Sequence, residues 1–236
     1  TQEPLPLVIG NEWTFRVEVR SGSQRTNSSE LKISVMATER IGDVDTYVLA
    51  YSQSGSIFQK GNYAWKEGRL YLHRTVTDTQ PNVVDPPKPV LESPLGVGRK
   101  WAWSGFAGTY RGAEEVEVVS MEKTVVPAGT FDAYKVKYVL KAASMGPTVY
   151  RWFVDGVGLV KEEHILPNQA SVIVLELTSS RLASPQGVPL VFIVGLVAVS
   201  FAVAAIVILT TKRRRVVQKK ATLDNGVAEA ERKTPI

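Results

Sequence analysis

Apolar and polar residues alternate with a period of two along much of the first 180 residues. Val17 and Val19 are separated by charged residues, and Leu31, Ile33 and Val35 repeat the pattern after a polar turn. This period places one set of side chains on each face of a strand, so it predicts antiparallel strands with one buried face. We therefore expect an all-β fold of about ten to twelve antiparallel strands, in a curved or barrel-like sheet.

One stretch, residues 188–211, breaks the alternation because its 24 residues carry no charge. As a helix it would be about 36 Å long, enough to cross a hydrocarbon core of about 30 Å. A buried core helix is the alternative, but it would need a large partner fold, and the basic cluster after Thr211 argues against it. The stretch is predicted to be one C-terminal transmembrane helix.

The charges on the two sides of this stretch predict the topology. Of the 28 Lys and Arg residues, eight follow residue 211, and of the 23 Asp and Glu residues, three do. The net charge is zero before the stretch and +5 after it, so we expect residues 1–187 outside the cytoplasmic membrane and the tail inside. The excess positive charge is therefore no indication of nucleic-acid binding. Export requires a signal peptide, and we expect that one has been removed.

Two sets of residues predict contacts at the membrane. Small residues at helical spacing within the span would let a second helix approach for self-association or docking. The basic residues after the span either attract anionic lipid, at about 1 kcal/mol each near the surface, or only fix the topology. The small residues are Gly195, Ala198, Ala202 and Ala205, and the basic residues are Lys212, Arg213, Arg214, Arg215, Lys219 and Lys220.

Three blocks of sequence recur in the same order after 87 or 88 residues. The clearest is the pattern Pro-Leu-x-x-Gly-x-x-Trp-x-aromatic, which occurs at 6–15 and again at 94–103. Because internal repeats determine architecture, we expect two fused copies of one β unit. The other matched blocks are 45–51 with 132–138 and 63–65 with 150–152.

The repeat and the apolar stretch together predict the domain boundaries. Four prolines between the copies favour an extended linker without donors for a β-ladder. The predicted segments are β repeat 1 (1–75), a Pro-rich linker (76–93), β repeat 2 (94–180), a juxtamembrane linker (181–187), the transmembrane helix (188–211) and a basic cytoplasmic tail (212–236).

The second copy resembles a known group of proteins. It contains Gly-x-x-Trp, then Val-Pro-Ala-Gly-Thr-Phe at 126–131, then Gly-x-Gly-Leu-Val at 156–160. This order is similar to that of exported bacterial β-domains of unknown function, often lipoproteins. The resemblance covers about 94–166, and it implies a curved antiparallel sheet distantly similar to lipoprotein-carrier folds. It implies no established activity, and the first copy lacks the last two motifs.

Tryptophans form the sharpest pattern of candidate site residues. They are interpreted as core anchors, because packing requires the same residue in both copies whereas a ligand site rarely does. The alternative is an aromatic platform for a lipid, glycan or peptide. The five are Trp13, Trp65, Trp101, Trp103 and Trp152, of which four lie at matched positions.

Catalytic and metal-binding chemistry has little support in the sequence. Cysteine is absent, and the two histidines, His73 and His164, lack ligand clusters at metal-binding spacing. The adjacent pairs Glu114-Glu115 and Glu162-Glu163 would point to opposite faces of a strand, so neither pair makes a carboxylate dyad. We expect no cofactor and no enzymatic activity, although an enzyme with a site built from distant residues stays an alternative.

The leading hypothesis is a non-enzymatic binding or interaction module held outside the cytoplasmic membrane by one helix. The alternative from a different class is an accessory structural subunit of a larger membrane complex. Asn27 begins an Asn-x-Ser sequence on a polar turn and is a candidate glycosylation site.

Overall fold

A computed structural model describes residues 3–21, 24–25, 28–141, 147–166 and 171–183. They belong to one compact unit, Thr1–Val197, and the second unit, Ala198–Ile236, lies outside the described residues. The predicted transmembrane helix, its small residues, the basic tail and Asn27 also lie outside them. No helix within the described ranges has the length and apolar character needed to cross a membrane.

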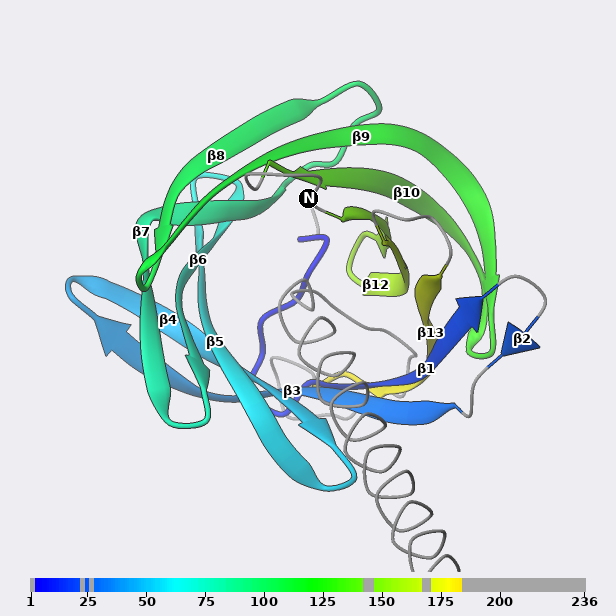
Figure 1. Ribbon diagram of the computed structural model, residues 1–236, viewed down its shortest axis with the longest axis horizontal. Coiled ribbons are helices and arrows are strands. Elements are labelled where there is room, and N and C mark those ends of the chain that lie inside the picture. The colour runs from blue at the N-terminus through cyan, green and yellow to red at the C-terminus, as the bar shows by residue number, and fades with distance from the viewer. Residues whose placement is uncertain (1–2, 22–23, 26–27, 142–146, 167–170, 184–236) are drawn as a thin grey trace, which may run out of the picture. The chain divides into compact units, whose positions relative to one another are not determined.

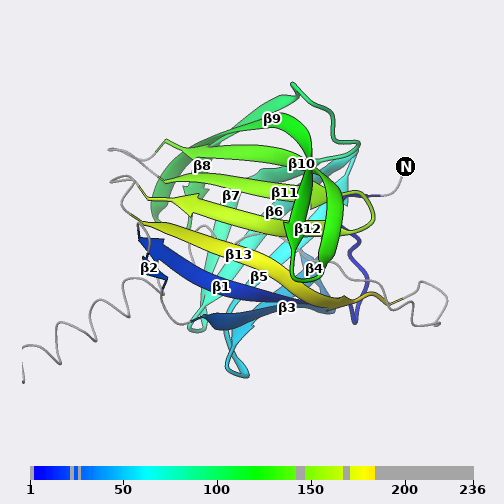
Figure 2. The ribbon, with the colours of Figure 1, turned by 90° about the vertical axis from the view of Figure 1, so that its right-hand side faces the viewer.

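The described chain folds into strands that form one antiparallel sheet. Apart from the short β2, each strand pairs with the next along the chain, and β13 also pairs with β1, so twelve strands close into a barrel (Figures 1 and 2). The short β2 pairs only with the end of β1. The strands are β1 (Glu12–Ser21), β2 (Gln24–Arg25), β3 (Ser29–Ile41), β4 (Val44–Gln53), β5 (Ser56–Lys66), β6 (Arg69–Thr77), β7 (Gln80–Glu92), β8 (Lys100–Ala107), β9 (Tyr110–Val126), β10 (Gly129–Leu140), β11 (Thr148–Val154), β12 (Gly158–Ile165) and β13 (Val172–Arg181).

The predicted all-β antiparallel fold is confirmed. Inward-facing apolar side chains such as Phe15, Ile33, Leu49, Val136 and Leu175 are buried, as the period of two requires. The sheet closes on itself, which removes the exposed strand edges of an open curved sheet. Closure therefore decides between the two architectures left open by the sequence.

The two Gly-x-x-Trp segments form the same turn. Gly10 and Gly98 both have a positive φ, 92° and 88°, which favours glycine. Each donates its amide to the neighbouring strand, Gly10 to Val35 O at 2.9 Å and Gly98 to Val118 O at 2.8 Å. The two turns precede β1 and β8, which lie six strands apart in either direction around the barrel.

The matching of the two copies differs in one block. Tyr47 of β4 pairs with Tyr63, whereas Tyr134 of β10 pairs with Phe153. The strand register thus places Phe153, not Tyr150, at the position that corresponds to Tyr63. The tandem repeat as a whole stays a prediction.

The Pro-rich segment expected as a linker is instead part of the sheet. It contains β7, which pairs with β6 along most of its length but with β8 through only two residue pairs, Val84 with Ala107 and Asp85 with Phe106. Proline has no amide N–H, so this segment cannot supply a full ladder. We call this junction of β7 and β8 the seam. Side chains complete it, because the indole Nε1 of Trp101 donates to Pro89 O at 3.1 Å and that of Trp103 to Pro86 O at 2.8 Å.

The barrel has two distinct ends. We call the end at which β1 and β8 begin and β13 finishes the exit end, and the opposite one the far end. The segment before β1 crosses the exit end (Figure 1), where Leu5 accepts a hydrogen bond from Trp65 Nε1 and Glu3 O accepts one from the Gly156 amide. Leu5, Leu7 and Leu95 are buried there, so apolar side chains close the exit end.

The hairpin of β9 and β10 folds over the outer face of the barrel (Figure 2). Its tip, in the Val-Pro-Ala-Gly-Thr-Phe motif, reaches β13, where the Ala128 amide donates to Leu177 O at 2.9 Å. Along the way Glu122 accepts a 2.7 Å hydrogen bond from Trp152 Nε1. The hairpin therefore ties β9 to β11 and its own tip to β13, and neither contact is between neighbouring strands of the sheet.

The seam predicts a specific sensitivity to added volume. A Cβ at Gly105 would lie 2.4 Å from Asp85 O and 2.7 Å from Pro86 Cδ, so Gly105→Ala should force β7 and β8 apart and cost about 1 to 3 kcal/mol. Gly112, directly opposite on β9, is the control, because its Cβ would meet only Trp103 at 3.4 Å. Urea unfolding of both variants measures the difference, and equal stabilities would contradict this account of the seam.

Candidate functional site

Polar side chains from five strands meet inside the barrel. They alternate with outward-facing residues along each strand, so the closed sheet directs them to a common interior. We call them the interior polar cluster, and its members are Tyr51 of β4, Tyr63 of β5, Tyr138 of β10, Arg151 of β11, and Glu162 and His164 of β12.

An Arg-Glu-His triad is the charged centre of this cluster. Arg151 Nε donates to Glu162 Oε2 at 2.5 Å, and His164 Nε2 bonds the other carboxylate oxygen. Arg151 and Glu162 pair directly across β11 and β12, and their side chains are 3% and 0% exposed. The Arg151 guanidinium also lies 4.4 Å from the centre of the Tyr138 ring. Every strong charge in the triad therefore has a partner within contact distance.

The electrostatics keep Glu162 and Arg151 charged. Burial raises the pKa of Glu162, but the charge of Arg151 and the hydrogen bonds from Arg151 and His164 outweigh it and lower the pKa to about 2. Burial lowers the pKa of Arg151, but Glu162 raises it above its ordinary value. Glu162 is thus ionised and Arg151 protonated across the physiological pH range.

Tyrosine hydroxyls line the wall beside the triad. The Tyr51 and Tyr63 hydroxyls lie 2.9 Å apart, and Tyr138 donates to Val90 O at 3.0 Å. Burial raises the pKa of all three phenols, so they stay neutral. Gly61 makes the Tyr51–Tyr63 contact possible, because a Cβ there would lie 2.5 Å from the Tyr63 ring.

A second buried ion pair extends the polar interior toward the seam. Lys88 Nζ of β7 lies 2.7 Å from Glu114 Oε2 of β9 and 5.6 Å from the centre of the Trp103 ring. The charge of Glu114 also acts on Arg151 and Tyr138. The interior thus carries positive and negative groups in matched pairs.

This arrangement favours structural specificity over acid-base catalysis. A general base needs a pKa near the working pH, and the pKa of the buried Glu162 carboxylate lies far below that pH. Buried networks of this kind specify one packing when every member has a partner. Within the described ranges, no group of three or more His, Cys, Asp and Glu side chains could hold a metal ion.

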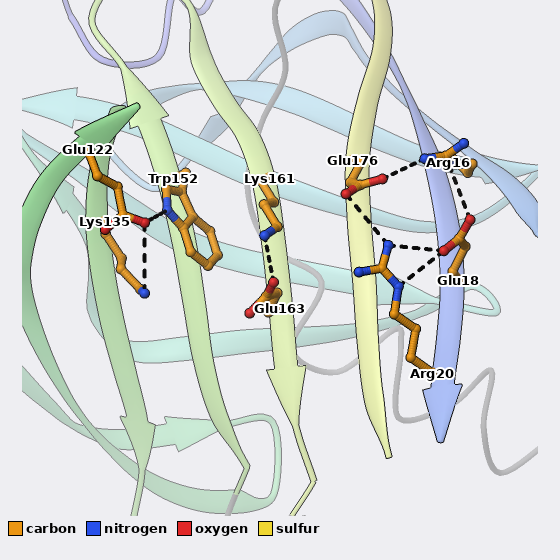
Figure 3. Close-up of polar contacts among 9 residues, drawn as sticks. All are labelled: Arg16, Glu18, Arg20, Glu122, Lys135, Trp152, Lys161, Glu163 and Glu176. Atoms are coloured by element: carbon orange, nitrogen blue, oxygen red, sulfur yellow. Dashed lines mark hydrogen bonds and ion pairs between the residues drawn. The ribbon is translucent and has the colours of Figure 1, made fainter. Parts of the chain in front are cut away.

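The five candidate tryptophans do not gather on one surface. Trp13, Trp101 and Trp103 are buried on the inner face, Trp13 on β1 and the other two on β8, half a turn away around the barrel. Trp65 is half-buried, and its indole bonds the N-terminal segment. Trp152 is buried on the outer face, between Lys135 and Lys161 at 4.9 and 4.6 Å (Figure 3). A shared aromatic platform would require these rings to lie together.

Strand alternation could have placed two members of the triad on one face from the sequence. Glu162 and His164 are two residues apart and therefore share a face, opposite to Glu163. The predicted split of the adjacent carboxylates is confirmed, because Glu162 is fully buried while Glu163 faces outward to Lys161. The partner Arg151 lies on the neighbouring strand, and its register with Glu162 is set by the β11–β12 pairing.

The outer face carries ion pairs between neighbouring strands. Glu176 of β13 lies 2.6 Å from Arg16 and 3.6 Å from Arg20 of β1, and Glu18 contacts both arginines (Figure 3). These pairs lie across the junction at which β13 returns to β1. Their opposite charges therefore support the closing register.

Exposed apolar side chains occur at both ends of the barrel. At the far end, Val83 of β7, Phe106 of β8 and Tyr110 of β9 surround the β8–β9 turn, where the Gly108 amide donates to Val83 O at 2.8 Å. We call these three the far-end patch. At the exit end, Ile9 and Val97 are exposed in the two Gly-x-x-Trp turns. Large contiguous apolar patches mark surfaces that bind other molecules, whereas single exposed apolar side chains are normal.

Breaking the buried triad should destabilise the barrel strongly. Glu162→Gln leaves the Arg151 charge without a countercharge, at an expected cost of about 3 to 5 kcal/mol. The double variant Arg151→Met with Glu162→Leu removes both charges and should recover most of that loss. Urea unfolding followed by tryptophan fluorescence measures both, and a double variant as unstable as the single one would contradict this interpretation.

The same carboxylate predicts a loss of stability in acid. The pKa of Glu162 is about 2 when folded and about 4.3 when unfolded, so its contribution is complete above the unfolded value. It is lost as the pH falls from about 4.3 toward 2. The difference in unfolding free energy between the wild type and Glu162→Gln should therefore shrink over that range. A constant difference would show that Glu162 does not have a lowered pKa.

Comparisons with known proteins show a partial resemblance to one family and to two solved structures. Residues 113–170 match a family described as DUF3108-like. The match covers less than half of the chain and overlaps most of the segment 94–166, for which the sequence indicated a resemblance. No curated protein matches. The fold is similar to that of a presumed lipoprotein from Parabacteroides distasonis ATCC 8503, at 18% identity over 76% of this chain and 98% of that one, with a TM-score of 0.46. It is also similar to a presumed exported protein with a YmcC-like fold from Bacteroides fragilis NCTC 9343, at 15% identity over 77% and 100%, also with a TM-score of 0.46. Over 113–170 the chain therefore resembles the DUF3108-like family.

Proposed function

We propose that the chain is a non-enzymatic interaction module, displayed outside the cytoplasmic membrane on the single helix 188–211 with its basic tail inside. The uncharged stretch and the one-sided basic residues of the sequence support the anchor and its orientation. The barrel is the part that meets a partner, and the partner is another protein.

The observation that carries this proposal is that the interior polar groups are hydrogen-bonded to one another. Arg151, Glu162 and His164 bond among themselves, and Tyr51 bonds Tyr63. A substrate would have to separate buried charge pairs, and each charged group would then be left without its countercharge. Recognition is therefore assigned to the outer surface.

The far-end patch is the part of that surface best suited to a protein partner. Phe106 and Val83 lie diagonally across β7 and β8 on the same face, since Asp85 is the residue opposite Phe106. Tyr110 lies beside them at the β8–β9 turn but on the other face of the sheet, because it pairs with Ala107, and it is the most exposed large apolar residue of the described chain. Tyrosine is one of the residues enriched among those that dominate the binding energy of protein interfaces.

Photo-crosslinking in intact membranes tests the proposal. The full chain carries a photoreactive amino acid at Tyr110, and Ile57 is the control position, because it is exposed at the far end on β5. We expect one discrete adduct from position 110 and none from position 57. The adduct should fall at least several-fold when Phe106 and Val83 are both changed to Ser.

Other outcomes would overturn the proposal. The absence of an adduct at 110, or equal adducts at both positions, would remove the far-end patch as a binding surface. Stable co-purification with a membrane complex in mild detergent, unchanged by the Phe106 and Val83 changes, would favour the accessory-subunit alternative. Protease added to intact spheroplasts should remove the barrel and spare a C-terminal tag, and digestion of that tag would end the proposed orientation.

A further inference from the structure

Two exposed aliphatic side chains occupy corresponding positions at the exit end. Ile9 is 51% and Val97 59% exposed, and each directly precedes the glycine of a Gly-x-x-Trp turn. The two turns have the same internal hydrogen bond. The Asn11 amide donates to Val8 O at 3.0 Å, and the Arg99 amide donates to Gly96 O at 3.1 Å. The backbone therefore holds both side chains in the same local geometry.

These two residues lie on opposite sides of the same end. They precede β1 and β8, which are separated by six strands in either direction around the twelve-stranded ring. The segment with Leu5 and Leu7 crosses the space between them, buried against the barrel. A flat surface can contact both side chains at once, whereas a compact protein ligand would have to cover the entire end.

The chain leaves the barrel at this end, beside one of the two residues. The Ala183 amide donates to Asn11 Oδ1 at 2.7 Å, and a Cβ at Gly10 would lie 3.7 Å from that of Ala183. Only residues 184–187 separate Ala183 from the uncharged stretch that begins at Val188. Fully extended, the five steps from Ala183 to Val188 span at most about 18 Å. The exit end is therefore tethered close to whatever surface the stretch enters.

We propose that the exit end rests on the lipid surface, with Ile9 and Val97 inserted at the level of the headgroups. This inference rests on the proposed anchor and adds the orientation of the barrel. Apolar side chains gain by leaving water at such an interface, and two contacts on opposite sides limit the tilt of the barrel. The far-end patch consequently faces away from the membrane, toward partners in the surrounding space.

The absence of cysteine from the whole chain makes site-specific labelling direct. Single variants Ile9→Cys and Val97→Cys report on the exit end, and Ile57→Cys and Phe106→Cys, with similar exposures of 46% and 49%, report on the far end. Each full-length chain is labelled with bimane and reconstituted into vesicles of phosphatidylcholine and phosphatidylglycerol. Lipids with a nitroxide in the headgroup quench a label that lies at the surface.

We expect quenching at positions 9 and 97 to exceed that at 57 and 106 several-fold. A label on Lys100→Cys, also at the exit end, should lose at least half of its quenching when Ile9 and Val97 are both changed to Ser. Equal quenching at the two ends would overturn the inference, and so would a Lys100 label that is unaffected by the Ser changes. Quenching at 9 and 97 that needs no nitroxide lipid and rises with protein density would assign this end to a second copy instead.

Flotation of the same vesicles separates this inference from the proposed function. A chain that floats with the vesicles but shows no preference between the ends retains the anchor and loses only the orientation. A chain that fails to float has no anchor, and both proposals are then wrong.

Discussion

A closed antiparallel barrel requires a hydrogen-bonded partner on both sides of every strand in its ring, and the rest of this structure depends on meeting that requirement. The junction of β13 with β1 meets it through nine residue pairs. The junction of β7 with β8 has only two, because prolines in β7 cannot donate. The indoles of Trp101 and Trp103 supply the missing donors from the side chains of β8. The barrel is closed by backbone at one junction and largely by side chains at the other.

Closure makes the interior a place where charges need partners. The side chains of Arg151 and Glu162 are 3% and 0% exposed, so each charge compensates the other at short range. Lys88 and Glu114 form a second ion pair near the seam. Because these groups are held by four different strands, their pairing also specifies which strands lie together. The cluster accordingly favours one packing of these strands.

The two ends of the barrel differ in the side chains that they carry. The exit end is closed by Leu5, Leu7 and Leu95, and it is the end from which the chain leaves β13. The far end presents Val83, Phe106 and Tyr110 around a tight turn. A polar outer wall with ion pairs such as Arg16 with Glu176 lies between them. In the function that we propose, the anchor lies at the exit end and the partner binds at the far end.

The sequence by itself determined the all-β class, because the period of two in runs such as 16–20 and 31–35 is a local property of the chain. It also determined that Glu162 and Glu163 point to opposite faces, which follows from strand geometry alone. Only the tertiary structure decided that β13 returns to β1, that the Pro-rich 76–93 segment contains a strand, and that Arg151 meets Glu162 and His164 inside. The physical reason is that pairing register and closure depend on contacts between residues far apart in the chain. Local patterns show which face a residue occupies but not which residue lies opposite it.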